Sequence, residues 1–136
     1  MYFPDLSRYE YSVDGGQMLN VGWLEKGHEF PTGQLDAAER DALVDLAVHS
    51  ENVMRGLHDC EFCDVESPIV AVRTDGRGER AFLGTGEVHL KGEESTYASP
   101  TLIIHYIDAH GYLPPPEFRN ALARMAGPDD LADTAP

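Results

Sequence analysis

The sequence predicts a single α+β domain with a small antiparallel sheet and about three helices. A chain of 136 residues is close to the commonest domain size, and its 42% apolar content is enough to bury one core. Short β-forming stretches separated by turn residues fill the middle of the chain. Stretches with helical periodicity and capping residues stand before and after them. We expect the domain to cover residues 1–126, and residues 127–136 to form a disordered acidic tail.

The first part of the chain predicts an extended arm, a strand and a helix. The N-terminal YFPDLSRYEYS is rich in aromatic residues and contains a proline, which favours an arm packed on the body. Segment 16–25 mixes β-forming residues with glycine and predicts a strand. The following GHEFPTG contains turn-forming residues, and we expect this turn to pack Phe30 against the body of the domain. A helix is predicted over Asp36–His49, because Asp36 and Glu39 have capping-box spacing and an apolar stripe follows.

The second part predicts further strands and two helices. The stretch 51–60 predicts a strand, and SPIVAVR and RAFLG, joined by the turn TDGRGE, predict a hairpin. EVHLKG continues the sheet. Ser99 as N-cap and Pro100 at the first position predict a helix over TLIIHYIDAH, which Gly111 ends in the left-handed conformation. A short last helix is predicted over PEFRNALARMA.

The charge of the chain restricts its partners. With 24 acidic and 10 basic residues, the net charge is −14. Such a field repels phosphate backbones and anionic membranes, so we expect neither nucleic-acid nor membrane binding. It favours docking onto a basic protein partner. The first residues lack the basic and apolar regions of a secretory signal, so we expect a cytoplasmic location.

Both cysteines lie in one short stretch, GLHDCEFC. Cys60 and Cys63 have the knuckle spacing by which two thiolates on a tight turn reach one zinc ion. His105 and His110 follow in the late predicted helix, and histidine pairs at such spacing supply the other two ligands of Cys2His2 sites. Residues five apart on a regular helix point about 140° away from each other. Both histidines can therefore bind one ion only if the last turn loosens, which Gly111 permits.

Several alternatives stay open for these residues. His58 shares a strand face with Cys60 and competes as a zinc ligand. The cysteines could also be core thiols without a ligand, or a redox pair. The carboxylates around them raise the thiol pKa values, which disfavours a redox pair, and they attract a dication. Without a metal, His105 could instead be a core histidine held by hydrogen bonds. His110 could instead be a histidine at the C-terminus of the helix, where the helix dipole favours its positive charge.

Four segments together resemble a family of small uncharacterised bacterial proteins. They are YFPDLSRYEY, LNVGWLEKGHEFPTG, GLHDCEFC and HYIDAHGYLPPPEF. Members of this family combine a YFPDLS-type arm, a GWLxxGHxFPxG segment, a CxxC knuckle and a closing HYxxxHxYxPPxxF helix. The resemblance covers the chain to about residue 122. It implies that the cysteine and histidine blocks belong together, and it implies no reaction.

These observations favour a non-enzymatic zinc-binding domain that acts through protein–protein interaction, in an immunity or regulatory role. Four protein ligands close a zinc site, as in structural sites. The chain contains neither HExxH nor the deaminase pattern H-x-E…P-C-x-x-C. One alternative is a small zinc-dependent hydrolase with an open site formed by His58, Cys60, Cys63 and His105. Glu61 or Asp108 would then be its general base. The other alternative is a thiol redox sensor.

Overall fold

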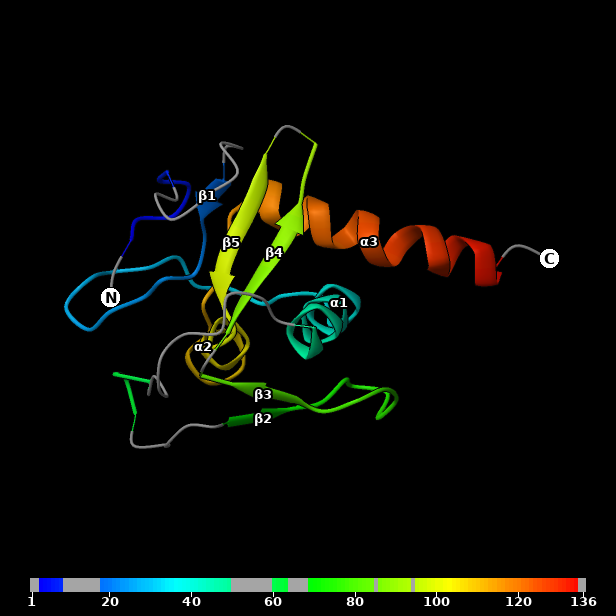
Figure 1. Ribbon diagram of the computed structural model, residues 1–136, viewed down its shortest axis with the longest axis horizontal. Helices are drawn as coiled ribbons and strands as arrows, with labels where there is room; N and C mark the ends of the chain where they lie inside the picture. Colours follow the sequence, from blue (N-terminus) through cyan, green and yellow to red (C-terminus); the bar gives the residue numbers. More distant parts are fainter. Residues whose placement is uncertain are drawn as a thin grey trace.

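The computed structural model of the chain describes residues 3–8, 18–49, 60–63, 69–84, 86–93 and 95–134, with side chains as far as Met125. In chain order its elements are β1 (Met18–Asn20), α1 (Ala37–Val48), β2 (Ile69–Ala71), β3 (Ala81–Leu83), β4 (Glu87–Lys91), β5 (Thr96–Pro100), α2 (Ile103–His110) and α3 (Pro116–Thr134) (Figure 1). The predicted α+β class is confirmed. His58 and the strand predicted over 51–60, apart from Cys60, lie outside the described residues.

The strands of the described regions form two small sheets. One has the order β1–β5–β4, with β5 parallel to β1 and antiparallel to β4. The other is the predicted hairpin of β2 and β3, in which Val70 lies opposite Phe82. Helices α1 and α2 lie between the two sheets (Figure 1). The prediction of one antiparallel sheet is wrong, because the strands divide into two sheets and the larger one is mixed.

Strand β5 occupies the stretch that the sequence assigns to the start of a helix. Ser99 and Pro100 are the last residues of β5, and α2 begins at Ile103 without a side-chain capping bond. Because β5 pairs with a strand on each side, its backbone groups are satisfied by the sheet rather than by a helix. At α1 the predicted N-cap, Asp36, is correct, but its side chain makes no capping hydrogen bond.

One main core joins the helices to the inner faces of the sheets. Its largest fully buried side chains include Leu43, Leu83, Ile103, Tyr112 and Phe118. The chain leaves β1 at Gly22, which has φ +82°, and a Cβ there would lie 2.6 Å from Cδ1 of Ile103. Glycine is therefore required for the close approach of this segment to the start of α2.

Helix α3 is longer than predicted. Its buried residues Phe118, Ala121 and Leu122 follow helical spacing and face the core. The sequence predicts an end near Ala126, whereas the helix runs to Thr134, through most of the segment predicted to be a disordered tail. Good helix formers such as Ala126 and Leu131 favour this continuation, although Pro128 lacks a backbone donor. No helix in the described regions has the length and apolar character needed to span a bilayer.

The described part of the N-terminal arm, residues 3–8, packs alongside β1. The amide of Leu6 donates to the carbonyl of Asn20 at 2.6 Å, and the amide of Asn20 donates to the carbonyl of Ser7 at 2.7 Å. Phe3 packs edge-on against Trp23. Leu6 has φ +68°, which costs a non-glycine residue about 1–2 kcal/mol. The surrounding contacts hold the arm in this strained conformation.

Candidate metal centre

The two cysteines and the two histidines of the predicted site converge in space. Sγ of Cys60 lies 3.3 Å from Nε2 of His110, and Sγ of Cys63 lies 3.3 Å from Nε2 of His105. All four ligand atoms lie within 4.8 Å of one another. A tetrahedral zinc ion with the usual bond lengths separates its sulfur and nitrogen ligands by roughly 3.3–3.8 Å. The four side chains are therefore close enough to share one ion.

The knuckle turn that carries the cysteines is fixed at its tip by Phe62. The backbone N–H of Phe62 donates to Sγ of Cys60 at 3.4 Å, which favours the thiolate. The Phe62 ring packs against Phe30, Tyr106 and His110, with ring centroids 5.5, 5.9 and 5.4 Å away. Sequence reasoning missed this residue, although its position between the cysteines is a usable signal.

The end of α2 departs from regular helix geometry where the two histidines must converge. The backbone N–H groups of Gly111 and Tyr112 both donate to the carbonyl of Tyr106, five and six positions back along the chain, instead of the usual four. Gly111 has φ +69°, in the left-handed region. The ring centroids of His105 and His110 lie 5.2 Å apart. The helix therefore ends in a wider turn directly after His110, where the sequence predicts a loosened last turn.

The segment GHEFPTG supports the same end of α2. Gly33 donates its amide to the carbonyl of Gly111, and Leu113 donates to the carbonyl of Pro31, both at 2.9 Å. Phe30 packs against Tyr112 as well as against Phe62. The packing of Phe30 on the body, as predicted, thus joins the knuckle to the residues after α2.

Burial determines the protonation of two of the candidate ligands. Desolvation raises the pKa of the Cys60 thiol, and the hydrogen bond from the Phe62 amide opposes part of this shift. Desolvation lowers the pKa of His105, and the neighbouring His110 lowers it further. The imidazole of His105 is thereby kept in the neutral form that binds metals. The thiol must lose a proton, which the charge of a bound cation makes favourable.

Metal affinity should consequently rise with pH. Because the pKa of Cys60 lies above its ordinary value of 9.0, this thiol is protonated at neutral pH and releases one proton on binding. His105, with a pKa below 6.5, releases none near pH 7. Cys60 alone should therefore add about one unit of log affinity per pH unit between pH 6.5 and 8.5. Zinc competition against a chelator of known pH dependence measures this slope, and an affinity that is flat across this range would contradict it.

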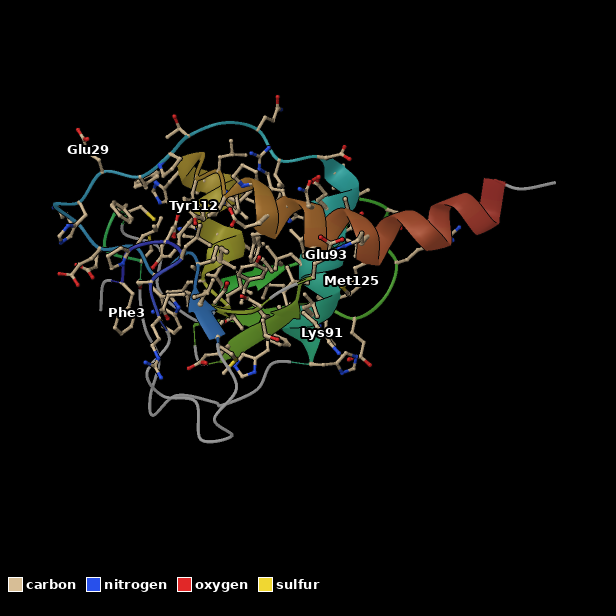
Figure 2. The ribbon with its side chains drawn as sticks, turned by 90° about the horizontal axis from the view of Figure 1, so that it is seen from above. Phe3, Glu29, Lys91, Glu93, Tyr112 and Met125 are labelled. Atoms are coloured by element: carbon tan, nitrogen blue, oxygen red, sulfur yellow. The ribbon has the colours of Figure 1, made fainter. Side chains whose placement is uncertain are left out.

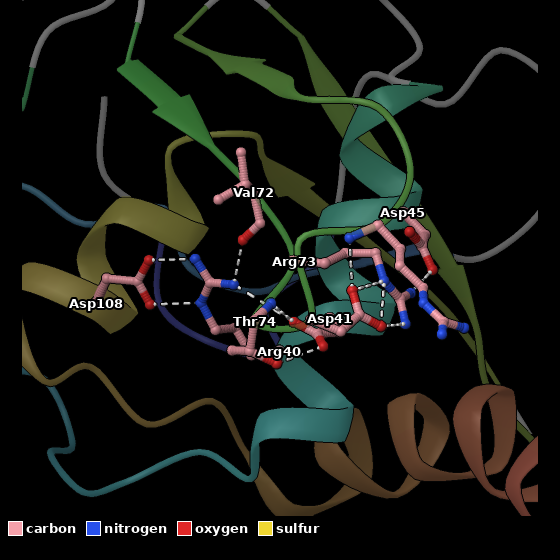
Figure 3. Close-up of polar contacts among 9 residues, drawn as sticks. Arg40, Asp41, Asp45, Val72, Arg73, Thr74 and Asp108 are labelled. Atoms are coloured by element: carbon pink, nitrogen blue, oxygen red, sulfur yellow. Dashed lines mark hydrogen bonds and ion pairs between the residues drawn. The ribbon is translucent and has the colours of Figure 1, made fainter.

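Arg40 of α1 joins α2 to the β2–β3 hairpin (Figure 3). Its guanidinium donates to both carboxylate oxygens of Asp108, at 2.9 and 2.8 Å, and to the carbonyl of Val72 at 2.7 Å. Asp108 lies in α2 between the two histidines. Its carboxylate is held by Arg40, and no hydrogen bond in the described part of the chain joins it to either histidine. Asp108 therefore anchors α2 to α1.

A neighbouring carboxylate holds the connection between β2 and β3. Asp41 is buried and accepts hydrogen bonds from the amide of Thr74 at 2.8 Å and from its hydroxyl at 2.6 Å (Figure 3). Arg73 beside it pairs with Asp45 of α1 and with Asp75 in the connection. The sequence carries no local signal for the contacts to α1, because Thr74 and Asp41 are 33 positions apart and Arg73 and Asp45 are 28 apart.

The fold and the site together define a small α+β protein with a Cys2His2 group that could hold one metal ion. The chain belongs to the family described as domain of unknown function DUF7919, whose model matches residues 1–123. This membership agrees with the expected uncharacterised family, whereas the individual motifs stay predictions. Neither a curated protein nor a solved structure gives a significant match to the chain.

Proposed function

We propose that this protein is a non-enzymatic domain whose fold is held together by one structural zinc ion, bound by Cys60, Cys63, His105 and His110. The observation that carries this proposal is the convergence of their four ligand atoms within 4.8 Å. The two cysteine–histidine pairs are separated by 42 and 50 positions along the chain. A shared ion would therefore fasten the knuckle to α2 and remove much of the freedom of the chain between them.

The chemistry of the ligands favours zinc. Two sulfurs and two imidazole nitrogens in a compact group are the donor set of tetrahedral structural zinc sites, whereas magnesium and calcium require oxygen ligands. Two thiolates also balance the charge of a dication, so that the loaded site is neutral overall. This balance suits a site in which Cys60 and His105 are buried.

A structural role fits the group better than a catalytic one. Four protein ligands leave no open position for water or substrate at a tetrahedral ion. Of the two carboxylates considered as general base, Asp108 is paired with Arg40 and Glu61 is exposed. We therefore propose that the domain acts through contact with another protein. A basic partner fits the net charge of −14, and such a contact should weaken with added salt.

Metal content and thiol reactivity together test the proposal. The native protein should contain one zinc per chain by elemental analysis, and its two thiols should react with a thiol reagent only after zinc is removed by a chelator. Zinc that remains bound in a His110→Ala variant with full affinity would favour an open, catalytic site. Protein without metal whose cysteines readily form a disulfide would overturn the proposal in favour of a redox sensor.

A further inference from the structure

A partly buried hydrogen bond ties the N-terminal arm to the residue two positions after His110. Tyr112 is fully buried, and its hydroxyl donates to Oδ2 of Asp5 at 2.8 Å. The other carboxylate oxygen of Asp5 accepts the backbone N–H of Gly22 at 3.0 Å. In Figure 2, Phe3 of the arm and Tyr112 lie toward the same end of the molecule, opposite Met125. The arm therefore contacts the segment that follows α2 at this end of the molecule.

Tyr112 belongs to the turn that brings the histidines together. Its backbone N–H is one of the two donors to the carbonyl of Tyr106, at 3.1 Å, in the widened last turn of α2. The carboxylate of Asp5 thus holds the side chain of a residue whose backbone shapes this turn. A change in the position of Tyr112 should therefore change the position of His110, because only Gly111 separates the two along the chain.

The ring of Tyr112 reaches the knuckle through a short series of aromatic contacts. Its centroid lies 6.0 Å from that of Phe30, which lies 5.5 Å from that of Phe62. Phe62 in turn packs against the His110 imidazole at 5.4 Å. Tyr112 is therefore connected to both sides of the candidate site, through the helix end and through the knuckle tip.

We propose that Asp5 is a positioning residue of the metal centre. Through Tyr112 it holds the end of α2 in the conformation that presents His110 to Cys60, so that arm docking and metal binding favour each other. This inference rests on the proposed function, because it requires that the four-residue group binds a metal. Coupling of this kind is reciprocal, and metal binding must stabilise the docked arm to the same extent.

Metal affinity of full-length variants tests the proposal. Tyr112→Phe keeps the ring and removes only the hydroxyl, and Asp5→Ala removes its acceptor. Each should weaken zinc binding, measured by chelator competition, by about 10- to 100-fold. Losses of this size are typical when a residue that orients a metal ligand is replaced. The double variant should bind zinc with the same affinity as Asp5→Ala alone, because the hydrogen bond that Tyr112→Phe removes is already lost in that variant. The visible spectrum of the cobalt-loaded variants should also depart from that of the wild type.

A matched control separates positioning from a general loss of stability. Val88 is buried in β4, which β5 separates from β1 and the arm, and Val88→Ala should lower stability while leaving zinc affinity and the cobalt spectrum unchanged. Zinc should in addition slow hydrogen exchange at the amides of Leu6 and Gly22 in the wild type. The proposal is overturned if Tyr112→Phe and Asp5→Ala bind zinc with wild-type affinity. Absence of metal binding in the wild type would instead overturn the proposed function.

Discussion

Replacing Cys60 by serine should abolish tight zinc binding and lower the thermal unfolding midpoint by roughly 10–20 °C. Where free zinc exceeds the dissociation constant about 1,000-fold, binding contributes about 4 kcal/mol to the folded state, and each kcal/mol corresponds to several degrees for a domain of this size. Because Sγ of Cys60 lies 3.3 Å from Nε2 of His110, its loss removes one of the four proposed ligands. Calorimetry with and without zinc measures the midpoint, and elemental analysis measures the metal.

The histidines of the chain supply the matched pair for this experiment. His105→Ala should reproduce the loss of metal and of thermal stability. His49→Ala removes an exposed histidine at the end of α1 and should change neither quantity. If the Cys60 and His105 variants kept the midpoint of the wild type in the presence of zinc, the site would not fasten the fold.

Phe118→Ala should lower the free energy of unfolding by about 3–5 kcal/mol without loss of zinc. Phe118 is fully buried in α3, with its ring 5.7 Å from that of Tyr97 of β5, centroid to centroid. Truncation leaves a cavity where the ring of Phe118 packs against Tyr97. Urea unfolding of the zinc-loaded protein measures the change.

A conservative variant serves as its control. Phe118→Leu retains most of the buried volume and should cost less than about half as much as the alanine variant. A loss below about 1 kcal/mol in Phe118→Ala would mean that α3 contributes little to the core. Loss of zinc in this variant would show that the metal site depends on the packing of α3.

The approach of the two cysteines and two histidines could be predicted because the signals within each pair are local. The spacing of Cys60 and Cys63 defines a knuckle, and Gly111 directly after His110 indicates a helix end able to widen. These patterns depend only on neighbours in the chain. His105 and His110 can approach one ion together only if the last turn of the helix widens, and Gly111 directly after His110 predicts this.

The supporting interactions could not be predicted, because their partners are remote in sequence. Arg40 and Asp108 are 68 positions apart, and Asp5 and Tyr112 are 107 apart. No periodicity or spacing rule pairs such residues. The same reason explains the error at β5, where Ser99 and Pro100 match the start of a helix by local preference. Pairing of β5 with the distant β1 and the neighbouring β4 outweighs that preference.

X-ray absorption at the zinc edge of the purified protein measures the ligands of the proposed site. We expect one zinc ion per chain with two sulfur ligands at about 2.3 Å and two nitrogen ligands at about 2.0–2.1 Å. A protein without zinc, or a zinc ion surrounded by oxygen and nitrogen with no sulfur, would contradict this expectation.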